Sequence, residues 1–146
     1  MTGTILVAVN DSPAAFAAAQ VAIDHARRWE SRLCVVTVIE GGEFGARFDV
    51  IATADERRQS AAEAVLNHVA ALGVAAGVTV DGRTRVGRVA AAILEEARVV
   101  DAMLIVMATV DKPSHTIPSL GRHTLRVLEF ATVPVLVVPS PSVWPA

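Results

Sequence analysis

The amino-acid sequence predicts an α/β domain in which a parallel β-sheet is covered by helices on both faces. The runs 103–107 and 133–138 have the nearly uniform hydrophobicity of strands buried on both faces. Segments with apolar residues at helical spacing separate the apolar runs, and this alternation is typical of βαβ units. With 146 residues, of which 53% are hydrophobic, the chain has the length and apolar content of one domain, and we expect a single domain over residues 1–146.

The first three elements are predicted from two apolar runs and a capped helix. Residues 4–9 form a buried strand, and residues 33–39 form a second one that contains the single cysteine, Cys34. Between them, Ser12 is a favourable N-cap and Pro13 a favourable first helical residue. The helix that they start extends to about Glu30, and its many alanines allow close approach to the sheet.

The middle of the chain predicts a glycine-rich connection, a helix and a more polar strand. The connection extends to about residue 52, where Thr53 and Glu56 match a capping box that starts the second helix. This helix ends near Gly73 or Gly77. Residues 78–86 are then expected to form an edge strand, although Asp81-Gly82 could instead make a turn.

The last third of the chain predicts helix, strand, loop, helix and strand. A helix follows Gly87, the strand 103–107 follows it, and a loop leads to a further helix after Gly121. The strand 133–138 closes the domain, and the proline-rich tail 139–146 is expected to be irregular. Right-handed crossovers connect the parallel strands.

Function is expected at the loop after Met107. In an open parallel sheet, ligands bind beyond the carboxyl ends of the strands. The helix after Gly121 offers backbone N–H groups and the positive end of its dipole, which suit a phosphate.

Composition excludes several classes of protein. A net charge of −2 argues against nucleic-acid binding by bulk charge. The longest weakly polar stretch, 69–80, is shorter than the ~20 residues of a membrane span, so we expect no membrane partner. No targeting signal is evident at the start, and a single cysteine fits a reducing compartment, so we expect a cytoplasmic protein. The four histidines lack metal-ligand spacing, and we expect no metal site and no catalytic residues.

Several residues resemble the universal stress protein family. They are the strand Leu-Ile-Val-Met at 104–107, the glycine at a helix start, and Val-Pro-Val-Leu-Val-Val-Pro at 133–139. The resemblance covers essentially the whole chain and implies a Rossmann-like three-layer α/β/α fold with strand order 3-2-1-4-5. Nucleotide-binding members carry Gly-x-x-Gly, nine residues, then Gly-Ser/Thr. At this spacing the motif falls on Ala108, Asp111, Gly121 and Arg122, of which one matches.

The resemblance also implies where a nucleotide would bind. Its base and ribose would contact the ends of the first, second and fourth strands, and its phosphates would contact the loop and the last helix. Position by position, these residues are Ala8, Val9, Asn10, Val38, Met107 and Ala108 for the base and ribose, and Asp111, Gly121, Arg122 and His123 for the phosphates. The aspartate of the family's first turn, Val-Asp-Gly-Ser, is Asn10 here.

Two functions follow from these residues. The first is a non-catalytic, dimeric stress-response module that acts through its surfaces, with a largely vestigial nucleotide pocket and no cofactor. Ala108 adds a methyl group and Asp111 a like charge where a nucleotide would pass. The alternative is a sensor of ATP or another adenine nucleotide, or a slow ATPase, with Arg122 as the phosphate ligand. In either case, the apolar edge strand between Val133 and Val138 is expected to pair with a second copy.

Overall fold

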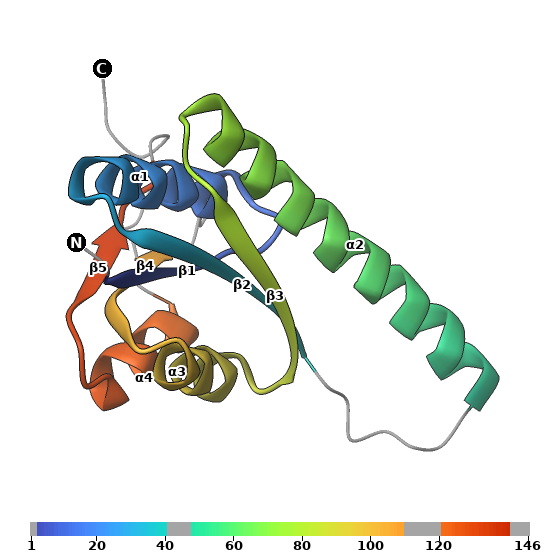
Figure 1. Ribbon diagram of the computed structural model, residues 1–146. Coiled ribbons are helices and arrows are strands. Elements are labelled where there is room, and N and C mark those ends of the chain that lie inside the picture. Colours follow the sequence, from blue (N-terminus) through green and yellow to red (C-terminus); the bar gives the residue numbers. More distant parts are fainter. Residues whose placement is uncertain (1–2, 41–47, 110–120, 141–146) are drawn as a thin grey trace.

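The computed structural model describes residues 3–40, 48–109 and 121–140, and within them strands and helices strictly alternate (Figure 1). In chain order, the elements are β1 (Thr4–Ala8), α1 (Pro13–Trp29), β2 (Arg32–Glu40), α2 (Phe48–Ala75), β3 (Val80–Gly87), α3 (Val89–Val99), β4 (Ala102–Ala108), α4 (Arg122–Phe130) and β5 (Val135–Val138). The predicted α/β class is confirmed.

All five strands form one parallel sheet in the order β3-β2-β1-β4-β5. The order implied by the family resemblance is therefore confirmed. The central strand β1 pairs with both neighbours, and Ile5 lies opposite Leu33 of β2 and Leu104 of β4. Because β1 is central and the strand order reverses beside it, the space beyond its carboxyl end is a topological switch point.

Two pairs of helices cover the two faces of the sheet: α1 and α2 on one, α3 and α4 on the other (Figure 1). Side chains alternate along β1, so Ile5 and Val7 pack in the core with α1 and α2, while Leu6 packs in the core with α3. Helix α1 lies close to the sheet because the residues between them are small. Alanines such as Ala18 and Ala22 are fully buried there. Its N-cap is Ser12, as predicted, since the Ala15 N–H donates to Ser12 Oγ at 3.1 Å.

The predicted start of α2 at Thr53 is wrong, because the helix begins at Phe48. A capping box is a local pattern, and the preceding residues 48–52 contain neither glycine nor proline to stop a helix. Residues 55–61 are all exposed, and Ala62 is the first buried residue described in α2. The amino half of this helix therefore extends beyond the sheet (Figure 1).

The alternative of a turn at Asp81-Gly82 is wrong as well. Both residues lie inside β3, where they are in register with Cys34 and Val35 of β2. The polar sequence of β3 is explained by its position at the edge of the sheet. Arg85 Nε lies 2.6 Å from Oε1 of Glu96, a fully buried residue of α3, which ties this edge strand to a helix.

Candidate functional site

A cavity of about 420 Å³ lies at the carboxyl ends of β1 and β4. Of the ten predicted site residues, seven line it: Ala8, Val9, Asn10, Val38, Met107, Ala108 and His123. Residues distant in the sequence meet here because parallel strands present their carboxyl ends at one edge of the sheet. The predicted location of the base and ribose side of the site therefore coincides with a real hollow.

The β1 side of the cavity is shaped by a short polar turn. The Val9 N–H donates to Val36 O at 3.0 Å, which continues the sheet contact one residue beyond β1. Ser12 Oγ then donates to Asn10 Oδ1 at 2.7 Å while it accepts from the Ala15 N–H. The carboxamide oxygen of Asn10 is thus already engaged, and its amino group is the part left to meet a ligand.

The β4 side is closed by the first turn of α4. Met107 is buried, and Thr124 Oγ1 donates to the carbonyl oxygen of Ala108 at 3.2 Å. This hydrogen bond connects the end of the strand to the helix across the loop that joins them. Ala108 contributes a half-buried methyl group to the cavity wall.

The backbone conformation at position 121 explains why this residue is glycine. Its φ of 80° and ψ of 153° lie in a region that side chains with a Cβ rarely enter. The glycine therefore sets the direction from which the chain enters α4. This conformation gives the one matching motif position a structural role whether or not a nucleotide binds.

The residues predicted to contact the phosphates do not all line the cavity. Arg122 lies outside the cavity lining and instead lines a neighbouring groove, whereas His123 lines both. His123 Nε2 lies 3.5 Å from Glu40 Oε1, an ion pair when the imidazole is protonated. Asp111 falls outside the described residues.

Sequence reasoning missed several residues of the cavity wall. These are Ser12, Ala15, Val36, Glu40, Val89, Ile93, Thr109 and Thr124. Glu40 is the last residue of β2 and Thr109 directly follows β4, so the rule used for Asn10 could have found them. Val89 and Ile93 come from α3, and no local pattern shows how closely that helix approaches β2.

The α3–α4 groove is a second hollow, of about 730 Å³, beside the cavity. We use this name for the space lined by Glu40, Gly87, Arg88, Val89, Ala90, Ala91, Leu94, Arg122, His123, Leu125, Arg126, Glu129 and Phe130. It shares Glu40, Val89 and His123 with the cavity, so the two hollows adjoin.

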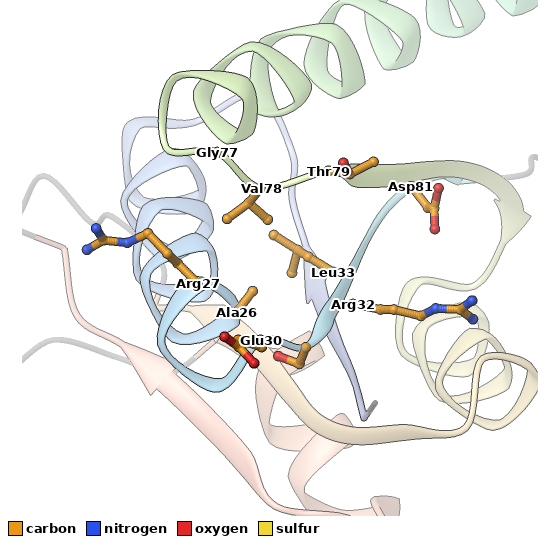
Figure 2. Close-up of a pocket in the computed structure, with 10 residues that line it drawn as sticks. Ala26, Arg27, Glu30, Arg32, Leu33, Gly77, Val78, Thr79 and Asp81 are labelled. Atoms are coloured by element: carbon orange, nitrogen blue, oxygen red, sulfur yellow. The ribbon is translucent and has the colours of Figure 1, made fainter. Parts of the chain in front are cut away.

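A third hollow, of about 460 Å³, lies at the amino ends of β2 and β3, away from the carboxyl ends that border the cavity (Figure 2). Its inner wall is formed by Ala26, Leu33 and Val78. Arg27 and Arg32 extend away from it in opposite directions (Figure 2). Because its cationic groups diverge, this hollow is a poor candidate for an anionic ligand.

The described residues hold no cluster of three or more His, Cys, Asp or Glu side chains that could bind a metal ion. In the same residues, no helix combines the length and the hydrophobicity needed to cross a membrane.

Comparisons with known proteins agree with this architecture. The model of the universal stress protein family matches residues 1–139. A protein of that family from Burkholderia pseudomallei is 28% identical, with a TM-score of 0.68 over 94% of this chain and 96% of that one. A universal stress protein from Archaeoglobus fulgidus in complex with dAMP is 22% identical, with a TM-score of 0.71 over 93% and 97%.

A third solved structure, an Arabidopsis thaliana universal stress protein family protein with AMP bound, is 16% identical. Its TM-score is 0.70 over 96% of this chain and 93% of that one. No curated protein sequence matches the chain.

A five-stranded parallel sheet covered by helices on both faces, with a cavity at its switch point, defines a Rossmann-like α/β protein. Because the family model covers nearly the whole chain, the chain belongs to the universal stress protein family.

Proposed function

We propose that this chain is a homodimeric, non-catalytic stress-response module whose cavity binds adenine nucleotides only weakly and is largely vestigial. The observation that carries this proposal is the chemistry of the cavity wall. The hollow is present, but the polar groups around it are changed from those of the family motif. The module would then act through its surfaces.

Two contacts on the wall support weak affinity. Ala108 carries a methyl group where a motif glycine lets the backbone approach a ribose. Asn10 replaces an aspartate, and its carboxamide oxygen already accepts a hydrogen bond from Ser12. Adenine and ribose both present donors, for which a free carboxylate is the stronger acceptor.

Isothermal titration with AMP and with ATP tests the proposal. We expect dissociation constants in the millimolar range or no measurable heat for the native chain. The variant Ala108→Gly, Asp111→Gly, Arg122→Ser should bind at least about tenfold more tightly, since tenfold corresponds to only ~1.4 kcal/mol. Asn10→Asp is the matched control for the first turn alone. Micromolar binding of AMP by the native chain would contradict the vestigial pocket.

The second candidate function is a nucleotide sensor or slow ATPase. The open cavity of about 420 Å³ favours it, because the described side chains leave the hollow unfilled. Two similar proteins were solved with dAMP and AMP bound. Release of inorganic phosphate from ATP would separate a slow ATPase from a sensor, and binding without turnover would favour the sensor.

The homodimer part of the proposal rests on β5. Strand β5 pairs with β4 on one side and is the last strand of the sheet, and Val135, Leu136 and Val137 are only partly buried. An unpaired apolar edge is stabilised when a second chain covers it.

Light scattering tests the dimer. We expect twice the chain mass for the native protein and a shift toward the monomer for Val137→Lys. Val86→Lys is the matched control, because it makes the same change on the opposite edge strand, where Val86 is exposed. A dimer that survives the first change but not the second would place the interface at β3.

We also propose a cytoplasmic location without a nucleic-acid partner. The support is the free, buried thiol of Cys34 and the net charge of −2. Cell fractionation tests the location, and a gel-shift experiment with duplex DNA and RNA tests the second point.

A further inference from the structure

The α3–α4 groove gathers three arginines that form no ion pair with any residue in 3–40, 48–109 or 121–140. Arg88, Arg122 and Arg126 all line it, and all three are exposed. Among the residues that the structure describes, none of the three has a carboxylate within 4.0 Å. In contrast, Arg85 and Arg98 are each bound to a glutamate. A concentration of unpaired guanidinium groups is unexpected in a chain whose net charge is negative.

The three side chains come from both walls of the groove. Arg88 is the N-cap residue of α3, and its side chain makes no capping hydrogen bond. Arg122 and Arg126 are four residues apart on α4, which places them as neighbours one helical turn apart. The Arg126 guanidinium lies 5.6 Å from the centroid of the Phe130 ring. Stacking of this kind holds a guanidinium in place while its N–H groups stay free to donate.

The acidic residues of the groove do not neutralise this charge. Glu40 Oε1 lies 3.5 Å from His123 Nε2 and forms no ion pair with the three arginines within the described residues. Glu129 lies three residues after Arg126 on the same helix, yet the two form no ion pair within the part of the chain that the structure describes. The guanidinium groups also outnumber the two carboxylates. The groove therefore favours an anionic ligand.

The form of the groove indicates a chain of anionic groups. It is larger than the cavity, about 730 Å³ against about 420 Å³, and the two adjoin at Glu40, Val89 and His123. A planar guanidinium binds a phosphate through two parallel hydrogen bonds. Three such groups in one groove offer a donor pair to each of several phosphates in one chain.

We propose that the α3–α4 groove binds a linear oligophosphate, with Arg88, Arg122 and Arg126 as its ligands. The ligand is a free chain of phosphates, with no nucleoside in the cavity. The free oligophosphate is independent of the function proposed above. The phosphate tail of a nucleotide bound in the cavity belongs to the sensor alternative instead.

Isothermal titration with sodium tripolyphosphate, ATP and AMP tests this proposal at low ionic strength. The native chain is compared with Arg88→Gln/Arg126→Gln and with the control Arg28→Gln. Arg28 is exposed on α1, outside the groove, and its replacement removes one charge of the same kind. Thermal unfolding of each variant verifies that it is folded. Arg122 is left unchanged so that the motif position tested above is not altered.

We expect the double variant to lose at least about tenfold in affinity for an oligophosphate, while Arg28→Gln changes it less than about twofold. Tight binding of tripolyphosphate alone identifies a free chain as the ligand. Arginine-dependent binding of ATP but not of tripolyphosphate overturns the proposal and favours the sensor alternative. The proposal is overturned if neither binds, or if the double variant binds both as well as the native chain does. AMP reports on the cavity alone, so its binding without any effect of the arginines overturns only this inference.

Discussion

The two faces of the sheet differ in the side chains that cover them. The face under α1 and α2 is a continuous apolar core, in which α1 contributes seven buried residues. The face under α3 and α4 holds buried polar groups, and α4 contributes only Thr124 and Val127. Leu125, Leu128 and Phe130 of α4 are instead exposed. We therefore expect the apolar face under α1 and α2 to supply most of the stability, while the face under α3 and α4 holds more of the polar contacts.

The largest loss of stability is expected for Ile23→Ala on α1. Ile23 is fully buried, and deleting most of its side chain should lower the free energy of unfolding by about 3 kcal/mol. Leu128→Ala on α4 is the matched control, because Leu128 is 40% exposed and should cost less than about 0.5 kcal/mol. Urea denaturation measures both. Similar losses for the two variants would show that the faces contribute equally.

The second-largest loss of stability is expected for Glu96→Gln on α3. Glu96 is 1% exposed and lies 2.6 Å from Arg85 Nε and 3.8 Å from Arg83 Nε. Removing its charge should cost about 2 kcal/mol, less than for a fully buried pair because both arginines reach solvent. Arg85→Gln should cost more than Arg83→Gln, as measured by urea denaturation. The reverse order would mean that the shorter contact is not the stabilising one.

A smaller effect is expected from Thr124→Val. The two side chains have nearly the same shape, so the change removes mainly the hydrogen bond from Thr124 Oγ1 to Ala108 O. The expected loss is about 1 kcal/mol. Hydrogen exchange of the α4 amides should rise with it, and unchanged exchange would mean that the bond does not hold this helix.

The smallest effect concerns Cys34, which faces α3. Burial raises the pKa of this thiol above its ordinary value of 9.0, and the carboxylates of Asp81 and Glu96 raise it further. The unfolded chain therefore loses its thiol proton at lower pH than the native protein does. The contribution to stability is complete below pH 9 and is lost as the pH rises further.

Denaturation series between pH 7 and 10.5 measure this slope, which Cys34→Ala should flatten. At pH 8 the native thiol should also resist a disulfide reagent that modifies the unfolded chain at once. Rapid modification of the native protein would show that the α3 side of the sheet opens more readily than its burial indicates.

The sequence predicted the fold well, because each apolar run is long, uniform and separated by clear helix signals. The failures lie where a local signal competes with a longer one. Thr53 offers a good cap, yet α2 continues upstream of it to Phe48. Asp81-Gly82 is a favourable turn, yet pairing with β2 holds both residues in a strand.

The candidate site was only partly predictable for a different reason. Residues that end strands, such as Asn10 and Ala108, are found from topology, and both line the cavity. Motif spacing placed Arg122 beside the cavity, whereas the structure places it in the lining of the α3–α4 groove. Spacing gives a position along the chain, whereas the side of a helix on which a residue lies depends on packing. Arg88 and Arg126 have no motif at all, and only the folded chain shows that they share a groove with it.

Helix α2 is supported along only part of its length, and this has a consequence for how the protein opens. Residues 55–61 are exposed, whereas Ala62, Val65 and Val69 are buried against the sheet. An unsupported helical turn gains little beyond its own hydrogen bonds, so it opens without disturbing the core. Amide protection should thus rise along a single helix, from seconds near Glu56 to the lifetime of the whole domain near Val69. A protease that cuts within residues 55–61 would leave the sheet, the cavity and the α3–α4 groove assembled.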